Sequence, residues 1–414
     1  MKKVTALLLL TLSTPLISYT AIAKELKKPS AIDKNYIDFQ IYGMTIAEGD
    51  SLDQSSSTSK YKNIAYTFTN VDLDFNFNKN ISLITQTSVQ NRKNGFARPY
   101  ALIDYTNGNN DIGLLFDNTG VTSRVLALNL HNKNTSLIIG KIRPRAGVAN
   151  GTNSEIIKED WYGVYGAMLN GGYANTNKIG MQFNTSFAIV PYSRQHLEIA
   201  AFKNDTTALN DPALSSIGTF GYSMPRSVQG IISTREAGNT FAPSSFSILA
   251  INESELIDKQ NISYSIYYRK QDINKQNGSF LAPENTIAAS AQYEKSYEDA
   301  KLGAFGNVAV VSNAFGISDL EEKYYTAAAY VDIDNFTIAF VYNLYTMNGL
   351  SNVGGNGKNI QAEQLSQTQI SFGYRLSKAL KVDVAYRQLT DGKTDKATQG
   401  VGLGLKYNIG TKDV

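Results

Sequence analysis

Apolar and polar residues alternate one by one along most of this chain, and its C-terminal part shows the pattern most clearly. Three successive runs carry an apolar side chain at every second position, at 370–376, 380–386 and 401–409. A period of two is typical of a β-strand with one apolar face and one polar face. In a soluble sheet the apolar face would pack against a second layer, whereas in a membrane-spanning barrel it faces lipid.

The polar positions of the same three runs carry charged side chains, namely Arg375, Lys381, Asp383, Arg387 and Lys406. The core of a β-sandwich could not bury such charges without partners. Each run also approaches the length of about 9 to 11 residues that a strand needs to cross a bilayer. The pattern therefore predicts a transmembrane β-barrel whose interior contacts water.

Short polar turns alternate with long polar loops along the rest of the chain. The expected turns lie at 78–80, 107–110, 131–134, 332–335 and 377–378, and the expected loops at 144–177, 204–216, 272–285, 312–323 and 347–365. Bacterial outer-membrane barrels have an even number of strands, short periplasmic turns and longer external loops. We therefore expect an all-β protein, a closed antiparallel barrel of about 16 to 18 strands over residues 35–409, which is wide enough for an aqueous channel.

The first 23 residues have the features of a secretory signal peptide. A basic start at residues 1–3 precedes a mostly apolar segment at 4–17, and Ala21-Ile22-Ala23 matches an Ala-x-Ala cleavage site. A transmembrane anchor is the alternative, but the apolar segment is short and Pro15 interrupts it. Residues 24–34 then form a short lead-in, and residues 410–414 a C-terminal tail.

Composition narrows the possible partners. The chain has 414 residues and a formal net charge of +3, which falls to about +1 when the two lysines of the signal peptide are removed. This balance gives no reason to expect nucleic acid as a partner. The 25 tyrosines suit strands and membrane interfaces, and the absence of cysteine means that the fold needs no disulfide. Two or three soluble domains are the alternative for this length, but no linker or change of composition divides the chain.

The signal peptide, the alternating strands, the asymmetry of turns and loops and the ending Gly404-x-x-Tyr407-x-Ile409 together resemble the Gram-negative porins. The resemblance implies an outer-membrane location, with membrane lipid, lipopolysaccharide and the barrel-assembly machinery as partners. It also implies a homotrimer that lets small hydrophilic solutes and ions diffuse passively. Many porins end at an aromatic residue, whereas this chain continues to Val414.

Porins fold their third long loop into the barrel, and by order and size the resemblance assigns this role to 143–177. The acidic candidates in this constriction loop are Glu155, Glu159 and Asp160. Parity along the strands then gives the pore-lining candidates, which are Arg269, Arg375, Lys381, Arg387, Lys406, Asp72, Asp74 and Asp383. An acidic loop opposite a basic wall would set up a transverse field that favours polar solutes. Alternatively, these charges pair across neighbouring strands or lie in water at the rims.

Enzymatic residues are not evident from the sequence. We expect no catalytic residue, no cofactor and no metal site, because the chain has two histidines and no cysteine. A barrel hydrolase would need a serine beside a positioned histidine, and His196, close to Glu198, is the one histidine worth testing. A passive channel is therefore the leading hypothesis. Its alternatives are a surface structure or adhesin and a substrate-selective channel, and conductance after reconstitution separates a channel from an adhesin.

Overall fold

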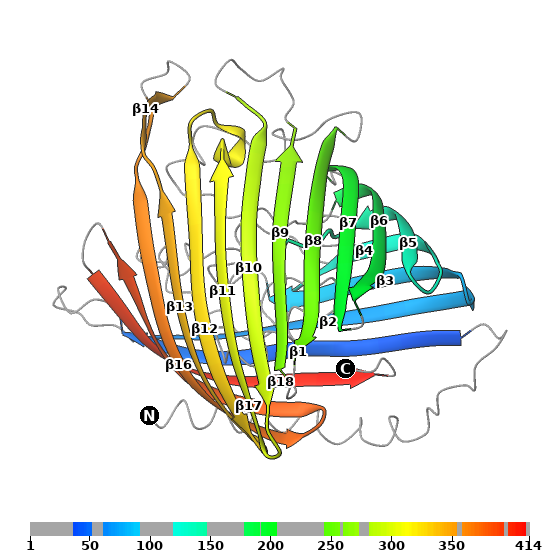
Figure 1. Ribbon diagram of the computed structural model, residues 1–414. Helices are drawn as coiled ribbons and strands as arrows, with labels where there is room; N and C mark the ends of the chain where they lie inside the picture. The colour runs from blue at the N-terminus through cyan, green and yellow to red at the C-terminus, as the bar shows by residue number, and fades with distance from the viewer. Residues whose placement is uncertain are drawn as a thin grey trace.

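Sixteen strands form one closed antiparallel barrel in the computed structural model of the chain (Figure 1). The structure describes residues 36–51, 61–91, 119–146, 178–190, 192–204, 244–256, 260–272, 281–353, 358–392 and 396–410. The barrel strands are β1 (Tyr36–Ser51), β2 (Tyr61–Asn78), β3 (Ile81–Asn91), β4 (Thr119–His131), β5 (Thr135–Ile142), β6 (Lys178–Val190), β7 (Ser193–Asn204), β8 (Ser245–Leu256), β9 (Gln260–Gln271), β10 (Glu284–Ser296), β11 (Ala300–Ser312), β12 (Glu321–Ile333), β13 (Phe336–Met347), β16 (Glu363–Ser377), β17 (Leu380–Asp391) and β18 (Lys396–Gly410). The fold class expected from the sequence is confirmed, and the strand number lies within the expected range.

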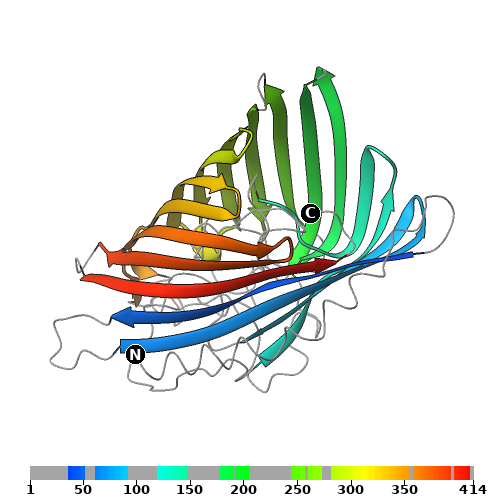
Figure 2. The same ribbon diagram turned by 90° about the horizontal axis from the view of Figure 1, so that it is seen from below.

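The first and last strands close the barrel. β1 pairs with β2 on one side and with β18 on the other, and Figure 2 shows the blue N-terminal and red C-terminal strands side by side. Inside the barrel the Gln40 amide donates to Asn408 Oδ1 at 2.9 Å across this seam. On the outside, the Tyr407 and Thr69 hydroxyls share a hydrogen bond that spans β1. Closure pairs the edges of the sheet, which a membrane requires because lipid offers no hydrogen bonds.

The two ends of the barrel differ, as the sequence predicted. At one end, here called the turn end, strands are joined by tight connections such as 79–80, 334–335 and 378–379. Asparagine side chains shape these turns: Asn78 Oδ1 accepts from the Asn80 amide at 2.8 Å, and Asn132 Oδ1 accepts from the Asn134 amide at 2.9 Å. The opposite end is here called the loop end, and the connection of β17 to β18 there is short.

Two described connections at the loop end have structure of their own. The connection after β11 contains the 3₁₀ turn η5 (Ala314–Gly316), and the one after β13 contains the hairpin of β14 (Leu350–Val353) and β15 (Lys358–Ile360) at the top of Figure 1. The expected signal peptide, the lead-in, the turn at 107–110 and residues 411–414 lie outside the described residues. Among the described residues, no helix is long and apolar enough to cross a membrane.

Side chains on the outer face are apolar and exposed, and those on the inner face are buried. Along β13, Ile338 and Phe340 are 46% and 47% exposed, whereas the intervening Ala339 and Val341 are almost fully buried. The same alternation continues in β16, where Phe372 is exposed. An exposed apolar belt of this kind is stable only against lipid.

The inner face is not polar throughout, which corrects the expectation of an interior lined by polar residues. A buried apolar cluster spans the inner face of several strands from β8 to β13 and includes Leu249, Tyr267 and Tyr345. The connection that contains η5 folds against it and adds Ile317 and Leu320. The interior therefore has an apolar sector in addition to its charged ones.

Candidate functional site

The inner wall of β17 and β18 carries a cluster of buried charges. Lys381 Nζ lies 3.4 Å from Asp383 Oδ1, and Lys406 Nζ lies 3.3 Å from Asp383 Oδ2. Lys381 and Lys406 are directly opposite each other in the strand register, so one carboxylate bridges two ammonium groups. All three residues are 5% exposed or less. The cluster therefore has one more positive charge than negative.

Glycines on the neighbouring strands make room for these side chains. Asp383 is paired with Gly373 of β16 on one side and with Gly404 of β18 on the other. A Cβ atom at Gly373 would lie 2.2 Å from Asp383 Oδ1 and 2.5 Å from Lys381 Cε. Arg387, which is 2% exposed, similarly faces Gly400. Small residues on the adjacent strands therefore let long charged side chains lie along the wall.

The two other predicted arginines are paired with acids on other strands: Arg269 of β9 with Glu284 of the adjacent β10, and Arg375 of β16 with Asp332 of β12, across β13. Arg269 Nη2 near the loop end contacts Glu284, and it donates to Thr286 Oγ1 at 2.9 Å. Arg375 near the turn end is 31% exposed and lies 3.4 Å from Asp332 Oδ2. These pairs hold the guanidinium groups against the wall.

The predicted acids fall into two groups. Asp72 is buried on the inner face of β2, and Asp74 is half-buried on the same face, directly opposite Asp38 of β1. Asn76 Nδ2 donates to Asp38 Oδ2 at 3.4 Å. The three acids of the expected constriction loop, Glu155, Glu159 and Asp160, lie outside the described residues.

The described start of the 143–177 segment is attached to the inner wall of β7. The Arg145 backbone amide donates to Glu198 Oε1 at 2.8 Å, and Arg145 Nε donates to Oε2 at 3.1 Å. Ala146, the last described residue at the start of this segment, is buried in the apolar cluster with Leu249. Glu198 was not among the predicted pore-lining residues. It has the same strand parity as Ala200, which is buried on the inner face, and the opposite parity to Ile199, which is exposed on the outer face, so the alternation could have identified it.

Another group of polar side chains, separate from the charged cluster of β17 and β18, lies on β6, β7 and β8. The imidazole of His196 contacts Ser186 on one side and Glu253 on the other. Sequence alone singled out His196 but neither partner, because both belong to other strands. No group of three potential metal ligands occurs within the described part of the chain.

Comparisons with known proteins agree with this architecture at the level of the fold. No protein-family model and no curated protein matches the sequence. Among solved structures, Salmonella typhi OmpF in complex with daunomycin is 12% identical, with a TM-score of 0.50, over 91% of this chain and 98% of that one. The DcaP channel of Acinetobacter baumannii (13% identity, TM-score 0.47, 93% and 100% covered) and an anion-selective porin from Comamonas acidovorans (10%, 0.48, 91% and 100%) are also similar.

The chain is thus an outer-membrane β-barrel with the porin fold. The expectation from the sequence resemblance is confirmed at this level, since the closed barrel has the porin architecture and the outer surface is apolar.

Proposed function

We propose that the protein is a water-filled channel of a bacterial outer membrane, through which small hydrophilic solutes and ions diffuse passively. The observation that carries the proposal is the set of charged side chains on the inner wall of a closed barrel of sixteen strands, namely Lys381, Asp383, Arg387 and Lys406. Barrels of about this size leave room for an aqueous channel. These four side chains are buried in the wall, so their charge acts on the lumen through its electric field.

The charges of this sector give the channel a direction of selectivity. Three of the four side chains are cationic, so the wall of β17 and β18 attracts anions and repels cations of similar size. Asp72 and Glu198 are acidic groups on other strands, and they favour polar solutes that can orient in the resulting field. We therefore propose a general channel with a moderate preference for anions.

Single-channel recording in planar bilayers tests the proposal. Wild-type protein should give discrete conductance steps, and Arg387→Gln with Lys406→Gln should shift the reversal potential toward cation selectivity. This pair of changes leaves Lys381 beside Asp383, so the buried carboxylate keeps a partner. Lys323→Gln is the matched control, because that lysine is exposed and paired with Glu321 near the loop end. Absence of conductance steps would refute the channel, and unchanged selectivity would remove these residues from the pore wall.

A homotrimer is part of the same proposal, with the outer face contacting lipid and lipopolysaccharide and the barrel-assembly machinery inserting the chain. The sequence resemblance supports the trimer, and the exposed apolar belt supports the lipid contact. The mass of the detergent-solubilised protein, measured with the bound detergent subtracted, tests the trimer. A mass equal to one chain would contradict it.

A further inference from the structure

Three adjacent strands place a hydroxyl, an imidazole and a carboxylate in a line on the inner wall. Ser186 Oγ of β6 lies 2.7 Å from His196 Nδ1 of β7, and His196 Nε2 lies 3.0 Å from Glu253 Oε2 of β8. Ser186 and His196 are directly opposite in the register, and Glu253 is opposite Arg194, two residues before the histidine. The arrangement thus follows from the strand pairing.

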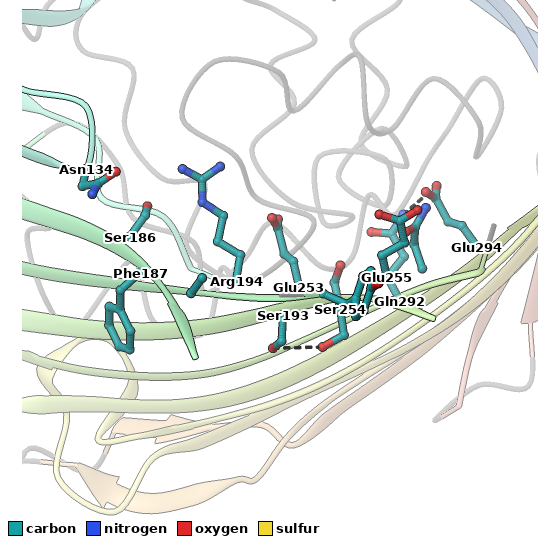
Figure 3. Close-up of a pocket in the computed structure, with 14 residues that line it drawn as sticks. Asn134, Ser186, Phe187, Ser193, Arg194, Glu253, Ser254, Glu255, Gln292 and Glu294 are labelled. Carbon is teal, nitrogen blue, oxygen red and sulfur yellow. Dashed lines mark hydrogen bonds between the residues drawn. The ribbon is translucent and has the colours of Figure 1, made fainter. Parts of the chain in front are cut away.

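Ser186 and Glu253 of this group line a cavity of about 680 Å³ at the turn end of the barrel, and His196 lies between them. Figure 3 shows Ser186, Arg194 and Glu253 on one side of the sheet, while Phe187 points to the other. The Arg194 side chain extends between Ser186 and Glu253 in this view and points away from the strands. The cavity volume is in the range of about 300 to 1,000 Å³ that is usual for small-molecule sites.

The histidine distinguishes this serine from others on the wall. Ser136 accepts a hydrogen bond from the Asn184 amide, and Ser265 pairs with Ser290, so neither bond offers a base. A serine hydroxyl is a weak nucleophile until a base takes its proton. His196 Nε2–H donates a hydrogen bond to Glu253 Oε2, and in this tautomer the Nδ1 lone pair accepts a hydrogen bond from the Ser186 hydroxyl.

We propose that Ser186 and His196 are catalytic residues for the hydrolysis of small esters, with Glu253 as the positioning residue. This activity goes beyond conduction, and it departs from the sequence expectation of no catalytic residue. Ser186 Oγ bonds to the ester carbonyl carbon while its proton moves to His196 Nδ1, and the carbonyl oxygen becomes negative. Collapse of this adduct breaks the bond to the alcohol, which takes the proton from His196. Water attacks the acyl-serine by the same route and releases the carboxylic acid.

Arg194 supplies positive charge beside the nucleophile. It is opposite Ala188 in the register, and Ala188 is two residues from Ser186 on the same face of β6. Diagonal neighbours of this kind are about 7 to 8 Å apart between Cα atoms, within reach of a long side chain. A guanidinium group there stabilises the oxyanion or binds an ester that carries a negative charge.

Ester hydrolysis and covalent labelling test the nucleophile. Purified full-length barrel in detergent is assayed with p-nitrophenyl butyrate and labelled with a fluorophosphonate, and the modified peptide is found by mass spectrometry. Wild-type protein should hydrolyse the ester and carry the label on Ser186. Ser186→Ala should lose the label and reduce hydrolysis about 100-fold or more. Ser136→Ala, a wall serine outside the cavity, should retain both.

A second variant tests the role of Glu253. In Glu253→Gln the amide donates to His196 Nε2 and moves the imidazole proton to Nδ1, so the base is lost. We expect kcat to fall about tenfold or more and KM to change much less, because the carboxylate acts on the reaction through His196. Conductance of the same samples in bilayers shows that each barrel is folded. A failure of the esterase proposal can therefore be distinguished from a failure of the channel proposal. Wild-type protein without label on Ser186, or equal hydrolysis by wild type and Ser186→Ala, would overturn the proposal.

Discussion

Removing the carboxylate of Asp383 gives the sharpest test of the charged wall. In Asp383→Asn, two buried lysines that face each other across β17 and β18 lose the anion between them. Removing one partner from a buried ion pair destabilises a protein by about 3 to 5 kcal/mol. Because each lysine contacts the carboxylate at 3.3 to 3.4 Å, at the long end for an ion pair, we expect the lower end, about 3 kcal/mol. Asp332→Asn removes the partner of the more exposed Arg375 and should change stability by about 0.5 kcal/mol.

Urea unfolding in lipid vesicles, followed by fluorescence and by the gel mobility of unheated samples, measures both variants. The further change Lys406→Met in the Asp383→Asn background removes one of the two lysines that contacted the Asp383 carboxylate, so the double variant should be more stable than the sum of the single effects predicts. The coupling should be about 1 kcal/mol or more, because the two groups are in contact. Equal destabilisation by Asp383→Asn and Asp332→Asn, or additive effects of the double variant, would refute the shared carboxylate.

Three other changes test the packing of the wall, the outer face and the attached segment. Gly303→Ala places a Cβ 1.9 Å from the Tyr330 ring and should lower the free energy of unfolding in urea by about 1 to 3 kcal/mol. Gly306→Ala is its control: a Cβ there meets no atom within 4 Å, so the free energy of unfolding should change little. Phe340→Arg on the lipid face should lower the free energy of unfolding by about 2 to 4 kcal/mol in vesicles. Glu198→Gln weakens the attachment of the 143–177 segment and should raise single-channel conductance if that segment narrows the lumen; an unchanged conductance would contradict this.

The outer face was predictable from the sequence because lipid imposes the same local requirement on every crossing. Ile370, Phe372 and Tyr374 alternate with polar residues, and the structure exposes all three on the outer side. The same alternation predicted Lys381 and Arg387 to line the pore, and the structure buries both side chains on the inner face. A period of two depends only on neighbours along the chain, so it can be recognised in the sequence without any knowledge of strand pairing.

Partners on the inner wall were not predictable, since they depend on the register between strands. Glu253 is 57 residues from His196 in sequence, and nothing local to either residue indicates the contact. The apolar sector escaped prediction for a different reason. Leu249 and Ile251 face inward while Ile248 faces outward, so both faces of β8 carry apolar residues. Alternation of apolar and polar residues therefore cannot distinguish the inner from the outer face of this strand.

The two faces of each strand meet different requirements: the outer face contacts lipid, and the inner face carries the candidate functional side chains. Outward positions that contact the lipid core have to be mostly apolar, so most of the charged side chains lie at inward positions. Strand pairing then decides which of those side chains meet. Asp383 between two lysines on β17 and β18, and His196 between a hydroxyl and a carboxylate on β6 and β8, both result from inward side chains that meet through the strand register. Among the described residues, the first group has no hydroxyl in contact with its carboxylate, whereas the second holds a base beside a hydroxyl nucleophile. Nucleophilic catalysis is therefore expected of the second group alone, although both belong to one wall.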